Sequence, residues 1–330
     1  MTKFLIMTSE ARVRQFCDVA ALPKDWELSF VGPFPTEAEA RAQGADAEFL
    51  LADAVSRVPE SLIASMPRLR MIQSEGVGHN GFDLAAAARR GIVVCNQAAV
   101  NKGAVAEQAV LLMLASLRRL VEGDALVRAG KQAQAKERFI LEGVRELSEL
   151  SVGLIGLGAI ARETALRLKP FSCELYYWSR TRTSAADEAA LGVCYRDKDE
   201  LLATCDILSL HLTVAPETVG FLGEKAFQRV KPGVIVINTA RGELIDQGAL
   251  AAALRAGRVG AAAFDTLSPE PVTLDNPLLR LPEACRYRVL FSPHIGGTTQ
   301  RVFKVIHEAI WENFQTFLAG GRPRNIVNGL

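Results

Sequence analysis

The chain has 330 residues, which at about 150 residues per domain suggests two domains. Apolar residues make up 49% and charged residues 23%, and these values exclude a disordered, collagen-like or coiled-coil chain. The 38 basic and 37 acidic residues leave a formal net charge of +1. Because binding to a duplex needs clustered positive charge, we expect no nucleic-acid partner.

Signals for export or membrane insertion are absent from the sequence. Four apolar residues near the start fall short of the about 7–15 in the core of a signal peptide. The apolar run at 110–115 is far shorter than the about 20 residues that span a bilayer. The six cysteines are scattered without a CxxC pair, as is typical of buried free thiols. We therefore expect a reduced cytoplasmic protein with no membrane partner.

Short apolar runs alternate with helix-like stretches along the whole chain. Runs of this length without polar alternation are typical of strands buried on both faces, and helices between them favour parallel crossovers. The pattern predicts an α/β fold with two doubly wound parallel sheets. The expected strands are 4–7, 28–31, 49–52, 71–73, 92–95, 152–155, 175–178, 207–210, 234–237, 260–264 and 289–291.

A domain boundary is expected near residues 101–103. Asn101 is a candidate N-cap for the next helix, which is apolar nearly all round and should therefore be buried. Residues 121–149 are polar and helix-prone, and they contain no strand run. The second sheet is expected to begin at Ser151.

The strongest single motif is a glycine turn between an apolar strand and a helix, at residues 152–170. Gly156 permits a tight turn, Gly158 lets the backbone approach a pyrophosphate, and Ala161 allows close helix packing. Glycine turns also occur without a ligand, but the strand before and the helix after this one favour dinucleotide binding. The candidate cofactor-binding residues here are Gly156, Gly158, Ala159 and Ile160.

The end of the next strand bears on the choice between NAD and NADP. Ser179 stands where an acidic residue would bind the ribose 2′-hydroxyl of NAD, and Arg180, Thr181 and Arg182 follow it. Hydroxyls and guanidinium groups attract a 2′-phosphate that a carboxylate would repel. An ordinary polar strand end is the alternative. The position favours NADP, with NAD possible, and makes Ser179, Arg180 and Thr181 candidate contacts.

Three later strands run into unusual polar residues. Arg241, Glu270 and His294 each follow an apolar run, and ligands of open α/β sheets bind beyond the carboxyl ends of the strands. Each residue alone has a structural explanation: a surface charge, a turn residue and a capped imidazole. Their joint occurrence beside a dinucleotide motif favours a catalytic set.

The remaining motifs narrow the chemistry. His211 follows another strand and, with its neighbour Leu212, is a candidate to line the cofactor cleft. His79 and His307 rank lower. No clustered spacing of metal ligands occurs, so we predict no metal, and neither a GxSxG nor a P-loop motif is present.

Taken together, these motifs resemble the D-isomer-specific 2-hydroxyacid dehydrogenase family over most of the chain. Within the family, residues 179–181 look like the NADP-preferring glyoxylate/hydroxypyruvate reductase branch. The segments that carry the resemblance are 74–83, 101–119, 152–161, 206–223, 236–250, 264–271 and 292–299.

The resemblance implies a split domain layout. Residues 1–101 and 295–330 would form a flavodoxin-like substrate domain, and residues 102–294 an inserted Rossmann cofactor domain. It also implies a homodimer built on the cofactor domain through the polar helical segment after Arg119. Because the chain ends shortly after residue 325, we expect no C-terminal regulatory domain.

The resemblance also assigns roles. Arg241 would bind the substrate carboxylate and polarise the carbonyl, His294 would be the acid/base, and Glu270 its carboxylate partner. The amides of Val77 and Gly78 would bind the substrate carboxylate, and Asp265 would orient the nicotinamide amide. Thr239 and Ala240, which lead into Arg241, are further candidate cofactor contacts.

Two features depart from the family pattern. Glu75 places a negative charge beside the proposed carboxylate loop, which is harmless to an anionic substrate if the side chain points into solvent. Residues 52–57 present no evident phosphate clamp, which weakens an assignment to 3-phosphoglycerate.

The sequence predicts an NADPH-preferring reductase of small 2-keto acids, with glyoxylate or hydroxypyruvate as leading substrates. An NAD-linked D-3-phosphoglycerate or D-lactate-type dehydrogenase is the alternative of the same class. A dinucleotide-sensing corepressor of the same fold is the alternative of another class.

Overall fold

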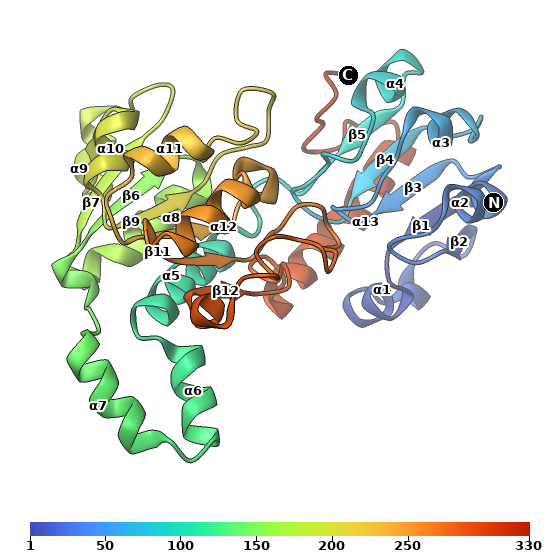
Figure 1. Ribbon diagram of the computed structural model, residues 1–330. Coiled ribbons are helices and arrows are strands. Elements are labelled where there is room, and N and C mark those ends of the chain that lie inside the picture. Colours follow the sequence, from blue (N-terminus) through green and yellow to red (C-terminus); the bar gives the residue numbers. More distant parts are fainter. The chain divides into compact units, whose positions relative to one another are not determined.

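The computed structural model describes residues 1–330, which divide into two compact units (Figure 1). Unit 1 comprises residues 1–101 and 298–330, and unit 2 comprises residues 102–297. Each unit contains one sheet in which every strand pair is parallel, so the predicted α/β class with two doubly wound sheets is confirmed.

The sheet of unit 1 has five strands in the order β2-β1-β3-β4-β5, the flavodoxin order. The strand order reverses between β1 and β3, which makes this pair the switch point of the sheet. The strands are β1 Thr2–Met7, β2 Trp26–Phe30, β3 Phe49–Ala52, β4 Met71–Ser74 and β5 Val93–Cys95. The helices are α1 Glu10–Phe16, α2 Glu37–Gly44, α3 Glu60–Ala64, α4 Leu84–Arg89 and the C-terminal α13 Gln300–Leu318.

The sheet of unit 2 has seven strands in the order β12-β11-β10-β9-β6-β7-β8. The six strands β6 to β11, counted along the chain, lie in the Rossmann order, and the switch point of the sheet lies between β6 and β9. The strands are β6 Ser151–Ile155, β7 Glu174–Trp178, β8 Cys194–Tyr195, β9 Ile207–Leu210, β10 Val234–Asn238, β11 Val259–Phe264 and β12 Val289–Phe291. The helices are α5 Lys102–Leu117, α6 Leu120–Arg128, α7 Gln132–Glu142, α8 Ala159–Leu168, α9 Ala185–Leu191, α10 Lys198–Thr204, α11 Glu224–Arg229 and α12 Gln247–Arg255.

All eleven predicted strands are present, and the structure adds one. Strand β8 has only two residues, too few for an apolar run to reveal it. The polar segment after residue 120 forms the helices α6 and α7, which extend from the sheet of unit 2 (Figure 1). The predicted cap of α5 is wrong, because the side-chain oxygen of Asn101 is buried and accepts no hydrogen bond. The predicted burial of α5 is confirmed by eight buried residues in its sixteen.

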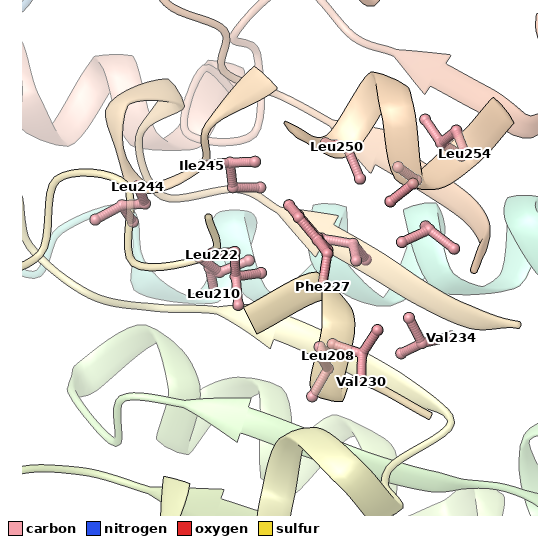
Figure 2. Packing of buried hydrophobic residues seen from close by; sticks show 14 of the residues in the cluster. Leu208, Leu210, Leu222, Phe227, Val230, Val234, Leu244, Ile245, Leu250 and Leu254 are labelled. Carbon is pink, nitrogen blue, oxygen red and sulfur yellow. The ribbon is translucent and has the colours of Figure 1, made fainter. Parts of the chain in front are cut away.

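A hydrophobic core beneath the carboxyl ends of β9 and β10 fixes the loops that follow these strands. Figure 2 shows Leu208 and Leu210 of β9 packed with Phe227 of α11. The same cluster contains Leu244 and Ile245, which lie just after the turn that holds Arg241 and are at most 4% exposed. Burying two such side chains stabilises the turn by about 3–6 kcal/mol, so the loop at the end of β10 is anchored from below.

No helix in the structure combines the length and the hydropathy needed to cross a bilayer. The six cysteines are all free thiols, and burial raises the pKa of Cys95 to about 12 and of Cys205 to about 11.

Candidate functional site

The glycine turn between β6 and α8 has the shape that a dinucleotide needs. Gly156 has φ +95°, and a Cβ there would lie 2.8 Å from the His211 carbonyl oxygen, so only glycine fits. Gly158, the N-cap of α8, faces open space, since a Cβ there would meet no atom within 4 Å. Ala159 and Ile160 form the first turn of this ten-residue helix, where amides have no intrahelical acceptor. Free amides facing open space at a helix N-terminus suit a pyrophosphate.

The end of β7 forms a short polar turn. Ser179 donates its hydroxyl to the Thr181 carbonyl at 2.6 Å, and the exposed Arg180 protrudes between them. Arg180 contacts Glu217 at 3.3 Å, whereas Arg182 binds Glu188 through two nitrogens. The turn therefore carries two cations with different partners.

His211 and Leu212 border the glycine turn. The carbonyl of His211 and the side chain of Leu212 are the atoms that a Cβ on Gly156 would strike. The His211 ring bonds to the Ser209 hydroxyl at 2.9 Å, and burial lowers the pKa of this histidine to about 4. The imidazole is therefore neutral at pH 7 and adds no charge beside a bound cofactor.

The turn before Arg241 is held by Asn238, which is fully buried at the end of β10. The Asn238 amide donates to the Arg241 carbonyl at 2.8 Å, and its oxygen accepts from the Ala240 amide at 3.0 Å. Gly242 lies directly against the backbone of residues 267–268, where a Cβ would clash at 2.2 Å. This close contact fixes the Arg241 turn beside the loop that leads to Glu270.

The loop that carries His294 is organised by Asp265, which is 3% exposed at the end of β11. Its carboxylate accepts the amides of Ile295 at 3.0 Å and Gly296 at 2.8 Å, and also the hydroxyl of Ser292. Gln108 of α5 donates to Ser292 at 2.9 Å. The contacts of Asp265 within the chain thus position the 292–296 loop, and a contact with the nicotinamide amide stays a prediction.

His294 and Glu270 form a carboxylate–imidazole pair at 2.5 Å, through Nδ1 of the ring and Oε1 of the carboxylate. Both side chains are partly exposed, and Nε2 of His294 has no partner in the chain. His294 has φ +56°, a left-handed conformation that costs energy for a residue with a side chain. The hydrogen bonds to Asp265 hold this strained turn, and strain retained in this way is typical of functional loops.

Two buried hydroxyls beside these residues lack partners. Thr239, which leads into Arg241, and Thr266, which follows Asp265, each have a hydroxyl oxygen without a hydrogen bond. Unpaired buried polar atoms are uncommon, and they fit a site that a polar ligand completes. The residues present in unit 2 therefore fit a dinucleotide cofactor.

In unit 1, the loop after β4 presents free amides. Its carbonyls are all bound: Gly76 by the Gln97 amide, Val77 by Asn96 and His79, and Gly78 by the Ser74 hydroxyl. The amides of Val77 and Gly78 donate to no acceptor in the chain. A loop with its carbonyls tied back and its amides free suits an anion.

The side chain of Glu75 does not point into solvent. Its side chain is buried and accepts hydrogen bonds from Thr8 at 2.5 Å, Arg12 at 2.5 Å and His307 at 3.0 Å. Arg12 also pairs with Asp53 at 2.8 Å. The charge of Glu75 is therefore neutralised by Arg12 and hydrogen-bonded, which removes the conflict with an anionic substrate at the neighbouring amides.

The structure thus groups the candidate residues in two sets. The unit 2 set joins His294 to Glu270 directly, and the contact of Gly242 with residues 267–268 links the Arg241 turn to the same loop. The unit 1 set is the amide loop of Val77 and Gly78. No group of three or more histidine, cysteine or acidic side chains is placed to hold a metal.

Comparison with known proteins identifies the family. The profile of the D-isomer specific 2-hydroxyacid dehydrogenase NAD binding domain matches residues 110–296, more than half of the chain. The glyoxylate reductase of Thermococcus litoralis is 35% identical over 82% of this chain and 81% of its own length. The D-3-phosphoglycerate dehydrogenase of Mycobacterium leprae is also 35% identical, over 94% of this chain, but the chain spans only 56% of that relative.

The fold comparison agrees. The structure of the Aquifex aeolicus D-lactate dehydrogenase, complexed with NAD and lactic acid, superposes with a TM-score of 0.88. It is 26% identical and covers both chains in full. With a glycine turn, a carboxylate–histidine pair and these matches, the chain belongs to the D-isomer specific 2-hydroxyacid dehydrogenase family.

Proposed function

We propose that the protein reduces a small 2-keto acid, of the glyoxylate or hydroxypyruvate type, to the D-2-hydroxy acid with NAD(P)H. The observation that carries this proposal is the His294–Glu270 pair at 2.5 Å in the same unit as a Rossmann glycine turn. Similarity to glyoxylate reductases, among them that of Thermococcus litoralis, supports the substrate class.

The chain's own groups supply the acid–base chemistry. Hydride would come from the nicotinamide ring of a bound cofactor. As the ketone oxygen gains negative charge, His294 donates a proton from Nε2, the ring nitrogen that is free of Glu270. Glu270 stabilises the imidazolium and fixes its tautomer. In unit 2, the proposed role of Arg241 is to bind the substrate carboxylate and polarise the carbonyl. In unit 1, the amides of Val77 and Gly78 are the proposed donors to a substrate carboxylate.

A second candidate is a D-3-phosphoglycerate or D-lactate-type dehydrogenase. Its support is the 35% identity to D-3-phosphoglycerate dehydrogenases, of which the chain spans about half the length. A phosphate group on the substrate would need cations near residues 52–57. Arg57 is the one basic residue of this segment, and the nearby Arg12 is already paired with Asp53. This favours a substrate without phosphate.

The substrate class is tested by oxidation of NADPH and of NADH in the presence of glyoxylate, hydroxypyruvate, pyruvate and 3-phosphohydroxypyruvate. We expect the highest kcat/KM with glyoxylate or hydroxypyruvate. Preference for the phosphorylated substrate or for pyruvate would support the second candidate. Cofactor binding without turnover of any 2-keto acid would instead support a dinucleotide-sensing corepressor.

For the cofactor, we propose a preference for NADPH, which rests on Ser179, Arg180 and Thr181 at the end of β7. Ser179→Asp places a carboxylate where it accepts from a free ribose 2′-hydroxyl and repels a 2′-phosphate. A lost charge-assisted hydrogen bond changes affinity by about 10–100-fold. Fluorescence titration of parent and variant with each cofactor measures the shift, and tighter NADH binding by the parent would contradict the preference.

We further propose a homodimer formed through α6 and α7. These helices expose apolar side chains, among them Leu120, Val127, Ile140 and Leu141. Exposed apolar clusters of this kind mark association surfaces. Light scattering after size-exclusion chromatography should give twice the chain mass of 35.7 kDa, and Leu141→Asp should shift the protein towards monomer.

A further inference from the structure

Arg182 is committed to a structural contact. It binds Glu188 through Nε at 2.8 Å and Nη2 at 2.9 Å, and its guanidinium lies over the Tyr195 ring. Glu188 also accepts the Tyr177 hydroxyl at 2.7 Å. The hydrogen bonds from Arg182 and Tyr177 lower the pKa of Glu188 to about 2. Because two nitrogens of Arg182 bind Glu188, and Tyr177 also donates to that carboxylate, Arg182 is held within the junction between β7 and α9.

Arg180 makes a much weaker contact. One guanidinium nitrogen lies 3.3 Å from a carboxylate oxygen of Glu217, and no second hydrogen bond supports the pair. The two side chains are 77% and 57% exposed. Single-point pairs between exposed side chains contribute little and exchange readily. An incoming anion can therefore displace Glu217 and bind the Arg180 guanidinium.

We propose that Glu217 is a specificity-determining residue, because its carboxylate competes with the 2′-phosphate of NADPH for the Arg180 guanidinium. This inference rests on the proposed function, in which the adenosine ribose lies beside Ser179. Glu217 then sets how strongly the enzyme prefers NADPH, and Arg182 contributes to the fold of the turn. NADH has no 2′-phosphate and can bind with the Arg180–Glu217 pair intact.

The physical consequence is an asymmetric response of the two cofactors. Glu217→Gln removes both the competitor and a negative charge that faces the phosphate. Since an exposed pair of this kind is worth up to about 1 kcal/mol, NADPH should bind about 2–5-fold more tightly. NADH affinity should stay within about 1.5-fold of the parent, because NADH has no 2′-phosphate that competes with Glu217 for Arg180.

The experiment is a double-mutant cycle with cofactor Kd as the readout, measured by fluorescence titration of the whole chain. Its variants are Glu217→Gln, Arg180→Gln and the double variant. We expect Arg180→Gln to lower the NADPH preference. Glu217→Gln should then have no further effect in that background, because Glu217 acts through Arg180. The matched control is Asp199→Asn, which breaks another exposed pair, with Arg229 at 2.7 Å, in the same unit.

Three results would overturn the proposal. The first is an unchanged ratio of the NADPH and NADH dissociation constants in Glu217→Gln. The second is an equal gain from Glu217→Gln with and without Arg180, which would indicate a general charge effect. The third is a gain of the same size in Asp199→Asn. If the parent binds both cofactors and one of these results is found, only this inference fails. If the parent binds neither cofactor, the proposed function fails with it.

Discussion

The two units each contain a glutamate–histidine pair, and the surroundings of the pairs differ. In unit 2, Glu270 meets His294 at 2.5 Å, and the side chains are 30% and 28% exposed. In unit 1, Glu75 meets His307 at 3.0 Å, and the side chains are 1% and 0% exposed. The same residue types therefore lie at a partly solvent-exposed strand end in unit 2 and inside a packed core in unit 1.

The remaining contacts separate the two roles. Each ring has one nitrogen bonded to its glutamate and one nitrogen without a hydrogen bond, but the second nitrogen of His307 is buried. The His294 ring is partly exposed, so a substrate atom can still reach it. The His307 ring stacks against Phe16 and Phe303, and its carboxylate partner is shared with Thr8 and Arg12. A glutamate–histidine pair suits acid–base chemistry when one ring nitrogen remains accessible to a substrate. It contributes to the stability of the fold when packed side chains cover the whole ring.

The largest expected effect comes from removing the accessible ring. His294→Ala should lower kcat for ketone reduction by about 10²–10⁴-fold, the usual range for a lost general acid. Cofactor binding should change little, because the glycine turn and the β7 end are separate from residue 294. Steady-state kinetics with saturating cofactor provide the measurement, and His307→Gln is the contrasting variant, expected to retain kcat where it folds. A kcat of the His294→Ala variant equal to that of the parent, with chemistry rate-limiting, would remove His294 from the mechanism.

Removing the carboxylate partner tests how the pair is tuned. Glu270→Gln keeps a hydrogen-bond acceptor near Nδ1 but loses the charge that stabilises the imidazolium. We expect kcat to fall by about 10–100-fold with a small change in KM. A variant that merely loosened the loop would instead raise the KM and leave kcat nearly unchanged.

The contrast between the pairs also explains what the sequence could predict. The strands, the sheet class and the residues of the His294–Glu270 pair lie in local motifs: apolar runs, a glycine turn and short polar segments at strand ends. The Glu75 cluster joins residues 8, 12, 53, 75 and 307 from different elements. No spacing in the chain signals such a contact, so the burial of Glu75 was not predicted, and His307 ranked low. Asn101 shows the opposite error, because a favourable cap residue does not make the expected bond and its side-chain oxygen is buried without a partner.

Disrupting the buried Glu75–His307 pair should lower the free energy of unfolding. Glu75→Gln removes the charge that faces Arg12 and weakens hydrogen bonds from three partners. Hydrogen bonds to charged groups contribute about 1.5–3 kcal/mol each, and glutamine retains part of them, so we expect a loss of about 1–2 kcal/mol in the free energy of unfolding. Chemical denaturation followed by fluorescence measures this loss.

The matched control is Glu10→Gln, which breaks the exposed pair with Arg14 at 2.7 Å and should change stability by less than about 0.5 kcal/mol. Equal effects of the two substitutions would show that burial of Glu75 adds nothing.

A third histidine, without any carboxylate, sharpens the comparison through pH. Burial lowers the pKa of His211 to about 4, below its usual value of 6.5. The unfolded chain then binds a proton as the pH falls below 6.5, and the folded chain does not until about pH 4. Stability is therefore fully present above pH 6.5 and is lost as the pH falls towards 4. Between pH 7 and pH 5 the loss attributable to His211 should be about 2 kcal/mol. His211→Asn removes this titration, so the unfolding free energy of the variant should fall less than that of the parent over the same interval.

Urea unfolding of both proteins without cofactor at the two pH values isolates the difference, since every other titrating group is shared. A parallel fall in the two proteins would mean that His211 is protonated equally in the folded and unfolded states.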